Sequence, residues 1–118
     1  MRLLKALILF LFLSPLFCVA QSNDNFNKGF DLFKKKDYKA AMEYFSKAIA
    51  ESPGNADAYN FMGIMKSELG DFRGSIDAFN KALAIDPSSY QTFTNRAHAK
   101  MLTRDYTGAW PIAALLYR

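Results

Sequence analysis

The sequence predicts an all-α protein, a solenoid of about three helix-turn-helix units. Residues of the same kind recur at a step of 34 along the chain, as in Gly29, Gly63 and Ala97, in Asp37, Asp71 and Asp105, and in Pro53 and Pro87. Within a unit the apolar residues have the spacing of one helix face. Glycine, aspartate and proline mark the places where helices should end or begin. Because one helix pair cannot bury its own apolar face, the units are expected to stack around a continuous core.

The first 20 residues are predicted to be a secretory signal peptide. Arg2 and Lys5 give a basic start, an apolar stretch follows, and Pro15 interrupts it near its end. Cys18-Val19-Ala20 then places small residues where signal peptidase requires them, so we expect cleavage after Ala20. The alternative is an uncleaved membrane anchor, but the apolar run is shorter than the roughly 20 residues that a spanning helix needs. The chain is therefore expected to be exported, as a periplasmic or secreted protein.

Removal of this segment would leave a chain with a small net charge and no cysteine. Of 15 basic residues, Arg2 and Lys5 lie in the signal, so 13 basic and 11 acidic residues remain and the net charge is +2. This charge is too small to indicate a nucleic-acid partner. Cys18 is the only cysteine and would leave with the signal, so no disulfide or cysteine metal site is expected.

The remaining residues, 21–118, are expected to form one domain with units at about 22–55, 56–89 and 90–118. The second unit is the clearest. Its first helix has an apolar stripe, and its second helix carries a further apolar set after the turn at Gly70-Asp71. The two sets are Tyr59, Met62, Met65 and Leu69, and then Phe72, Ile76, Phe79, Ala82 and Leu83. Small residues at Gly63 and Ala82 should let the two backbones approach closely beside Phe79, and Pro87 should end the unit.

The third unit keeps the repeat pattern only as far as Ala109. Ala113 stands where Phe45 and Phe79 predict an aromatic residue, and Pro111 lies too deep for the first turn of a helix. A proline inside a helix costs about 3 kcal/mol. Apolar residues at Trp110, Ile112, Leu115 and Leu116 replace the polar face that normally closes a repeat array. Two interpretations remain: this segment docks on another copy or on a partner, or the chain departs from its repeat near residue 110.

The repeat residues resemble the tetratricopeptide repeat (TPR) family. The second unit has Tyr59, Met62-Gly63, Phe79, Ala82 and Pro87 at the family's pattern positions, although Lys66 and Ser75 depart from it. The first unit has Gly29, Leu32, Ala41, Phe45, Ala48 and Pro53. TNRAHAK (94–100) is similar to first helices of many bacterial members, so the resemblance is to a bacterial secreted or periplasmic type. It covers residues 22 to about 109.

The resemblance implies a concave groove, lined by the first helix of each unit, that binds a peptide or protein segment. The candidate contact residues are Phe26, Asn27, Phe30, Phe33, Asn60, Phe61, Ile64, Thr94, Asn95, His98 and Met101. Further positions on the same helix faces are Asn23, Lys34, Asp57, Ser67, Glu68, Gln91 and Leu102. The aromatic members would suit an apolar segment whose backbone contacts Asn60 and Asn95. Because Phe26, Phe30 and Phe33 also have the spacing of a core face, they could instead pack inward.

One branch of the family grips the carboxylate tails of chaperones with lysine, asparagine and arginine side chains. The corresponding residues here are Phe26, Phe30, Phe61, Gln91 and Asn95. None of them is a cation, so a charge-assisted grip on a carboxylate is not expected.

The sequence offers no strong catalytic or cofactor-binding motif. His98 is the only histidine, no nucleophile motif stands near it, and a zinc site would need more ligands. We therefore expect no enzyme, metal or cofactor, and a protein or peptide partner without nucleic acid. Membrane contact is expected only through an uncleaved signal segment. The alternative is that the chain is the amino-terminal piece of a larger TPR protein whose later repeats or second domain carry the function.

Overall fold

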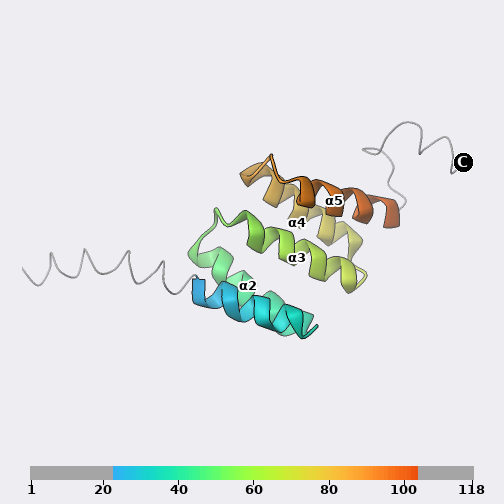
Figure 1. The fold of residues 1–118 in the computed structure, drawn as a ribbon. Helices are drawn as coiled ribbons and strands as arrows, with labels where there is room; N and C mark the ends of the chain where they lie inside the picture. Colours follow the sequence, from blue (N-terminus) through green and yellow to red (C-terminus); the bar gives the residue numbers. More distant parts are fainter. Residues whose placement is uncertain (1–22, 104–118) are drawn as a thin grey trace, which may run out of the picture. The chain divides into compact units, whose positions relative to one another are not determined.

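The computed structural model describes residues 23–103, which contain helices and no strand (Figure 1). The chain divides into two compact units, the first ending at Pro53 and the second beginning at Gly54. Unit 1 holds a helical segment at residues 23–34 and α2 (Tyr38–Glu51). Unit 2 holds α3 (Ala56–Glu68), α4 (Phe72–Ile85) and α5 (Tyr90–Leu102). The predicted all-α fold is confirmed. The proposed signal peptide and the stretch containing Trp110, Pro111, Ile112, Leu115 and Leu116 lie outside the described residues.

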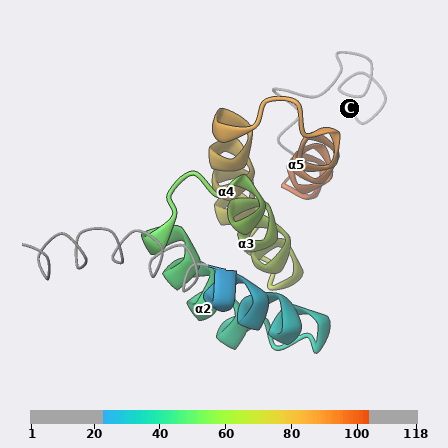
Figure 2. The same cartoon turned by 60° about the vertical axis from the view of Figure 1, so that its left-hand side comes forward.

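Within unit 2, α4 packs against both α3 and α5, as the turned view in Figure 2 shows. The chain reverses between α3 and α4 and again between α4 and α5, so α3 and α5 run in the same direction (Figure 1). These two helices are the first helices of the second and third predicted repeats. Their carboxyl-terminal ends consequently lie on the same side of the unit.

The helices α2, α3, α4 and α5 each begin after a polar capping residue. An oxygen of the capping side chain accepts a hydrogen bond from the amide three residues later. The pairs are Asp37 with Ala40 (3.3 Å), Asn55 with Ala58 (3.0 Å), Asp71 with Gly74 (3.0 Å) and Ser89 with Thr92 (3.3 Å). These contacts satisfy amides that the helix itself leaves without a partner. The predicted start at Asp71 is thus confirmed, and the prolines at 53 and 87 follow the ends of α2 and α4.

The first helix of each unit ends with one residue in the left-handed region. In unit 2 this residue is Gly70, with φ of 83°, and in unit 1 it is Lys36, with φ of 61°. The amide of the following aspartate closes the turn: Asp71 donates to the Lys66 carbonyl at 2.8 Å, and Asp37 donates to that of Leu32 at 3.0 Å. This is the Schellman arrangement, which favours glycine because a Cβ is unfavourable there.

We predict that Lys36→Gly raises the free energy of unfolding by about 1 kcal/mol, because glycine removes the Cβ clash of a left-handed residue. Urea unfolding followed by circular dichroism measures the change. The matched control is Lys35→Gly, one residue earlier at ordinary φ, which should lower stability by about 0.5–1 kcal/mol. Equal losses in the two variants would show that the Lys36 backbone is not strained.

The core of unit 1 forms around Phe45, which is fully buried together with Ala41 and Ala48 of the same helix. A Cβ added at Gly29 would lie 3.1 Å from the Phe45 ring, so this glycine permits the close approach of the helical segment. Phe26 meets Phe45 edge to face, with 5.3 Å between ring centroids. The Asn25 amide also donates to Glu51 Oε1 at 2.8 Å, which ties the start of the segment to the end of α2.

The core of unit 2 repeats this arrangement around Phe79. It is buried with Ala82 and Leu83 of α4, with Met65 of α3 and with Ala99 of α5. The close approach predicted at Gly63 is confirmed, because a Cβ there would fall 2.5 Å from the Phe79 ring. The predicted apolar stripe of the first helix ends one turn early. Leu69 is 48% exposed, because it forms the C-cap that precedes the left-handed turn.

Ser75 is the one polar residue on α4 that the structure buries completely, and its hydroxyl has no hydrogen-bond partner. The equivalent position of unit 1 holds Ala41. We predict that Ser75→Ala raises the free energy of unfolding by about 1 kcal/mol, because it removes an unsatisfied buried hydroxyl. Urea denaturation measures the change.

Thr92 provides the matched control for Ser75, since its hydroxyl is also buried but shares a 2.8 Å hydrogen bond with the Ser89 hydroxyl. Thr92→Val should therefore lower stability by about 1 kcal/mol. A destabilising Ser75→Ala would mean that the Ser75 hydroxyl has a partner in solution.

Candidate functional site

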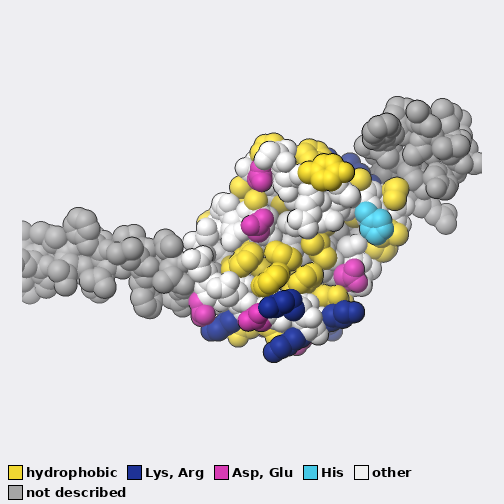
Figure 3. Space-filling model, viewed as in Figure 1, with side chains coloured by type: hydrophobic (Ala, Val, Ile, Leu, Met, Phe, Trp, Pro, Cys, Tyr) yellow, Lys and Arg dark blue, Asp and Glu magenta, His cyan; other side chains and the backbone are white. Residues whose placement is uncertain are grey.

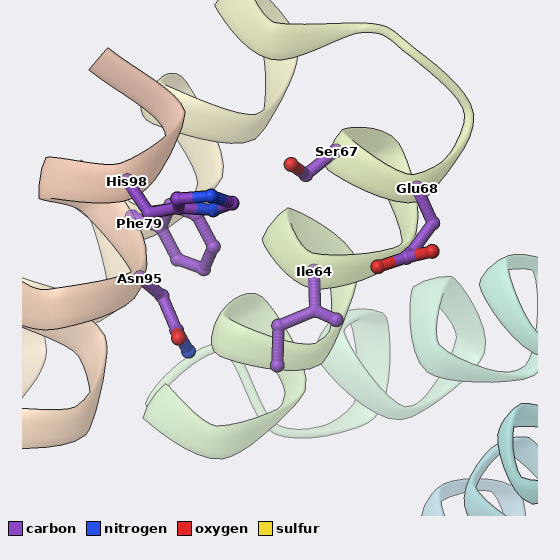
Figure 4. A pocket seen from close by; sticks show the side chains of 6 residues that line it. All are labelled: Ile64, Ser67, Glu68, Phe79, Asn95 and His98. Carbon is purple, nitrogen blue, oxygen red and sulfur yellow. The ribbon is translucent and has the colours of Figure 1, made fainter. Parts of the chain in front are cut away.

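A pocket of about 120 Å³ opens on unit 2 beside the later turns of α3 and α5 (Figure 4). Its lining residues are Ile64, Ser67 and Glu68 of α3, Phe79 of α4, and Asn95 and His98 of α5. The one-turn spacing of residues 64, 67 and 68 places them on one face of α3, and that of residues 95 and 98 does the same on α5. Three of the sequence-predicted candidates, Ile64, Asn95 and His98, are thereby brought together.

The two asparagines predicted to contact a peptide backbone are hydrogen-bonded to each other. Asn95 Nδ2 donates to Asn60 Oδ1 at 3.3 Å, linking α5 to α3. Asn60 is only 6% exposed, whereas Asn95 is half-buried and also lines the pocket. Of this amide pair, Asn95 therefore presents more of its side chain to a ligand.

His98 lies on the surface at the rim of the pocket, and its imidazole is visible in cyan in Figure 3. Within residues 23–103, no three side chains of His, Cys, Asp or Glu gather closely enough to hold a metal ion. In the same residues, no helix is long and apolar enough to cross a membrane. The pocket offers apolar, amide, hydroxyl, imidazole and carboxylate contacts.

The candidates of unit 1 are half-buried aromatic side chains beside one exposed amide. Phe26 packs on the core residue Phe45, so part of its surface belongs to the core. Phe30 and Phe33 are half-buried and stack with 6.4 Å between centroids, and the Phe33 ring also lies 5.9 Å from that of Tyr38. Asn27 is exposed. The sequence left open whether these phenylalanines face the groove or the core. In the structure the three rings pack partly inward and each keeps some exposed surface.

Two lysines of this helical segment, Lys28 and Lys34, are engaged in local contacts. Lys34 Nζ lies 2.8 Å from the Asp31 carboxylate and 5.0 Å from the Phe30 centroid. The hydrogen bond and charge of Lys34 lower the pKa of Asp31. In the same way, the hydrogen bond and charge of Asp24, 2.9 Å away, raise the pKa of Lys28. All four groups are exposed, so these pairs contribute little to stability.

The remaining candidates lie on unit 2 outside the pocket. Phe61 is half-buried, and Thr94 is exposed with its hydroxyl donating to the Tyr90 carbonyl at 3.0 Å. Met101 is 53% exposed near the end of α5.

Sequence reasoning gave Ser67 and Glu68 little weight, although both lie on the predicted face, and it treated Phe79 as core alone. The sequence feature that could have identified them is the spacing of Ile64, Ser67 and Glu68, which places all three on one helix face.

A family model described as tetratricopeptide repeat matches residues 32–96, which is more than half of the chain. The chain belongs to the tetratricopeptide repeat family. The TPR match spans the end of the first helix and the second helix of the first repeat, the whole second repeat, and the first half of the first helix of the third.

The related proteins are much longer than this TPR chain. It is 31% identical over 77 residues to a UDP-N-acetylglucosamine–peptide N-acetylglucosaminyltransferase of Giardia intestinalis, covering 65% of this chain and 5% of that protein. It is 39% identical over 54 residues to a tetratricopeptide repeat protein 36 homolog of Nematostella vectensis, covering 46% and 30% respectively. The chain therefore spans less than a third of either relative.

Solved TPR structures share the fold at low sequence identity. The TPR2B domain of yeast Sti1, determined as a complex with pHsp70, has a TM-score of 0.73 and 23% identity, covering 76% of this chain and 72% of that one. The second TPR domain of human RPAP3, in complex with the HSP70 peptide SGPTIEEVD, has a TM-score of 0.72 and 19% identity, covering 76% and 75%. MamA is also similar, with a TM-score of 0.71 and 22% identity, covering 74% and 51%.

Proposed function

We propose that this protein is a non-catalytic interaction scaffold that binds a peptide or protein segment on the first helices of its TPR units. The observation that carries the proposal is the pocket between the ligand-facing sides of α3 and α5. Ile64, Asn95 and His98 meet there on helices that the buried core of unit 2 holds in place. A pre-ordered surface loses little conformational entropy when it binds a flexible segment.

The peptides in the related structures support this class of partner but not its identity. The first TPR domain of Spaghetti (RPAP3) is bound to the HSP90 peptide SRMEEVD, and the second TPR domain of human RPAP3 to the HSP70 peptide SGPTIEEVD; both peptides end in EEVD. In this chain the positions that would hold a terminal carboxylate carry Phe26, Phe30, Phe61, Gln91 and Asn95. Without a lysine or arginine among them, the strong charge-assisted bonds to a carboxylate are lost. The proposed partner is therefore a segment other than an EEVD tail.

We also propose that the scaffold acts outside the cytoplasm. The basic start, apolar stretch and small residues up to Ala20 support this location, since together they have the pattern of a cleaved signal. Mass spectrometry of the protein isolated from the producing cells tests it. An amino terminus at Gln21 is the expected result, and an intact Met1 in the cytoplasmic fraction would contradict export.

The binding proposal is tested by selection from a random peptide display library against the full chain. Selected peptides are expected to bind with dissociation constants in the micromolar range, whereas the peptide SRMEEVD should not bind measurably. The double substitution of Asn95→Ala with His98→Ala should weaken selected peptides at least tenfold. Arg73→Ala, an exposed change on α4, is the control and should leave binding unchanged. Failure to select any peptide, or equal binding by the double variant, would contradict the proposal.

A further inference from the structure

We propose that the pocket of unit 2 receives one arginine side chain of the bound segment. This inference rests on the proposed function and specifies the chemistry of its ligand. A volume of about 120 Å³ is small beside the 300–1,000 Å³ of pockets for drug-sized ligands, and it suits a single side chain. The question is then which side chain matches the lining.

The polar lining consists of groups that attract a cation. Among the described residues that line it, Glu68 alone carries a charged group, and the side chains of Ser67 and Asn95 add oxygen acceptors. In Figure 4, Ser67 and Glu68 project from α3 on the side where Asn95 and His98 project from α5. No lysine or arginine of the described residues lines this pocket. A carboxylate ligand would therefore meet like charge, whereas a guanidinium would meet an opposite one.

The carboxylate of Glu68 is available for such a ligand. The two ion pairs found within residues 23–103 both lie in unit 1, and no described cation pairs with Glu68. The arginine of α5, Arg96, is engaged elsewhere: its guanidinium donates to Asn80 Oδ1 at 2.9 Å and lies 5.1 Å from the Phe93 centroid. A ligand arginine would thus not have to displace an internal partner.

The helix ends reinforce this preference for a positive charge. Ser67 and Glu68 are in the last turn of α3, and His98 is in the later half of α5, which runs in the same direction. The carboxyl-terminal end of a helix carries a partial negative charge of about half an electron. The end of α3 adds to the field of Glu68, although Lys66 in the same turn offsets part of it. The end of α5 lies one turn beyond His98 and therefore adds less.

The apolar part of the lining matches the rest of an arginine side chain. The half-buried side chain of Ile64 can contact the methylene groups, as apolar surfaces do for long basic side chains, and Phe79 closes the pocket behind it. The planar guanidinium can form two parallel bonds with a carboxylate and can stack on a flat ring such as that of His98. A lysine ammonium has neither property. These differences favour arginine over lysine.

The test uses N-acetyl-arginine methylamide as the probe and the full chain as the receptor. Because His98 is the only histidine, the Hε1 proton of its imidazole gives one assignable NMR signal at the rim of the pocket. The arginine probe should shift that signal saturably, with the lysine analogue weaker. The norleucine and glutamate analogues should give no saturable shift. A norleucine shift equal to that of arginine would overturn the proposal, since the pocket would then select only for an apolar side chain.

Glu68→Gln should weaken arginine binding at least fivefold, because it removes the charge and keeps the shape. Asp77→Asn removes an exposed carboxylate from α4 instead and should leave binding unchanged. Equal binding by Glu68→Gln and the unmodified chain would also overturn the proposal.

Peptide selection separates the two proposals. Peptides that bind the Asn95–His98 surface without arginine enrichment, and equally to Glu68→Gln, would contradict only the arginine pocket. Absence of any selected peptide would contradict the scaffold function itself.

Discussion

Phe79→Ala is expected to lower the free energy of unfolding by about 3–5 kcal/mol, the usual loss when a buried phenylalanine is truncated. Phe79 is 1% exposed and packs directly on the Gly63 backbone of α3. Its removal leaves a cavity that the rigid helix pair cannot easily close. Because domains of this size have a stability of about 5–15 kcal/mol, much of unit 2 should unfold at moderate urea concentration. Urea denaturation followed by circular dichroism measures the loss.

Phe93→Ala is the matched control for this truncation. It deletes the same side chain from α5, where Phe93 is 44% exposed. Less apolar surface is lost and no enclosed cavity forms, so the expected loss is about 1 kcal/mol. Similar losses for the two variants would show that Phe79 does not organise the core of unit 2.

The sequence predicted the contacts that recur once per repeat. The step of 34 paired Gly29 with Gly63 and Phe45 with Phe79, and the structure packs each glycine on the phenylalanine of its own unit. The left-handed residue of unit 1, Lys36, aligns with Gly70 at the same step, although the lysine gave no sign of this conformation in the sequence. These features depend on helix geometry alone, which the spacing of apolar and small residues determines.

Contacts made by unlike residues on neighbouring helices were harder to predict. The Asn60–Asn95 bond joins positions 35 apart, one residue off the repeat step, so a comparison of equivalent positions does not reveal it. The pocket combines a core residue, Phe79, with surface residues of two other helices. Its formation depends on how α3 and α5 are rotated against α4. The spacing of apolar residues determines a helix face only approximately. For this reason the sequence did not predict that Leu69 is exposed, and it left undecided whether Phe26 packs inward.

Gly63→Ala tests the closest helix contact of unit 2 and is expected to lower stability by about 2 kcal/mol. The added Cβ would lie 2.5 Å from the Phe79 ring, closer than real Cβ atoms approach other atoms. Overpacking of this kind costs about 1–3 kcal/mol, and occasionally more. Alanine also favours helix over glycine by about 1 kcal/mol, which offsets part of the loss. The clash should outweigh this gain because Phe79 is only 1% exposed and has little room to move away within the core. Urea denaturation gives the net effect.

Gly29→Ala is the matched control, because a Cβ at Gly29 would be 3.1 Å from the Phe45 ring. That ring needs to move by only a few tenths of an ångström, so the helix-forming gain of alanine should leave the variant within about 0.5 kcal/mol of the unmodified chain. Combining Gly63→Ala with Phe79→Leu should cost less than the sum of the two single changes, since the smaller side chain makes room for the new methyl group. Strict additivity in that double-mutant cycle would mean that Gly63→Ala destabilises unit 2 by some route other than contact with Phe79.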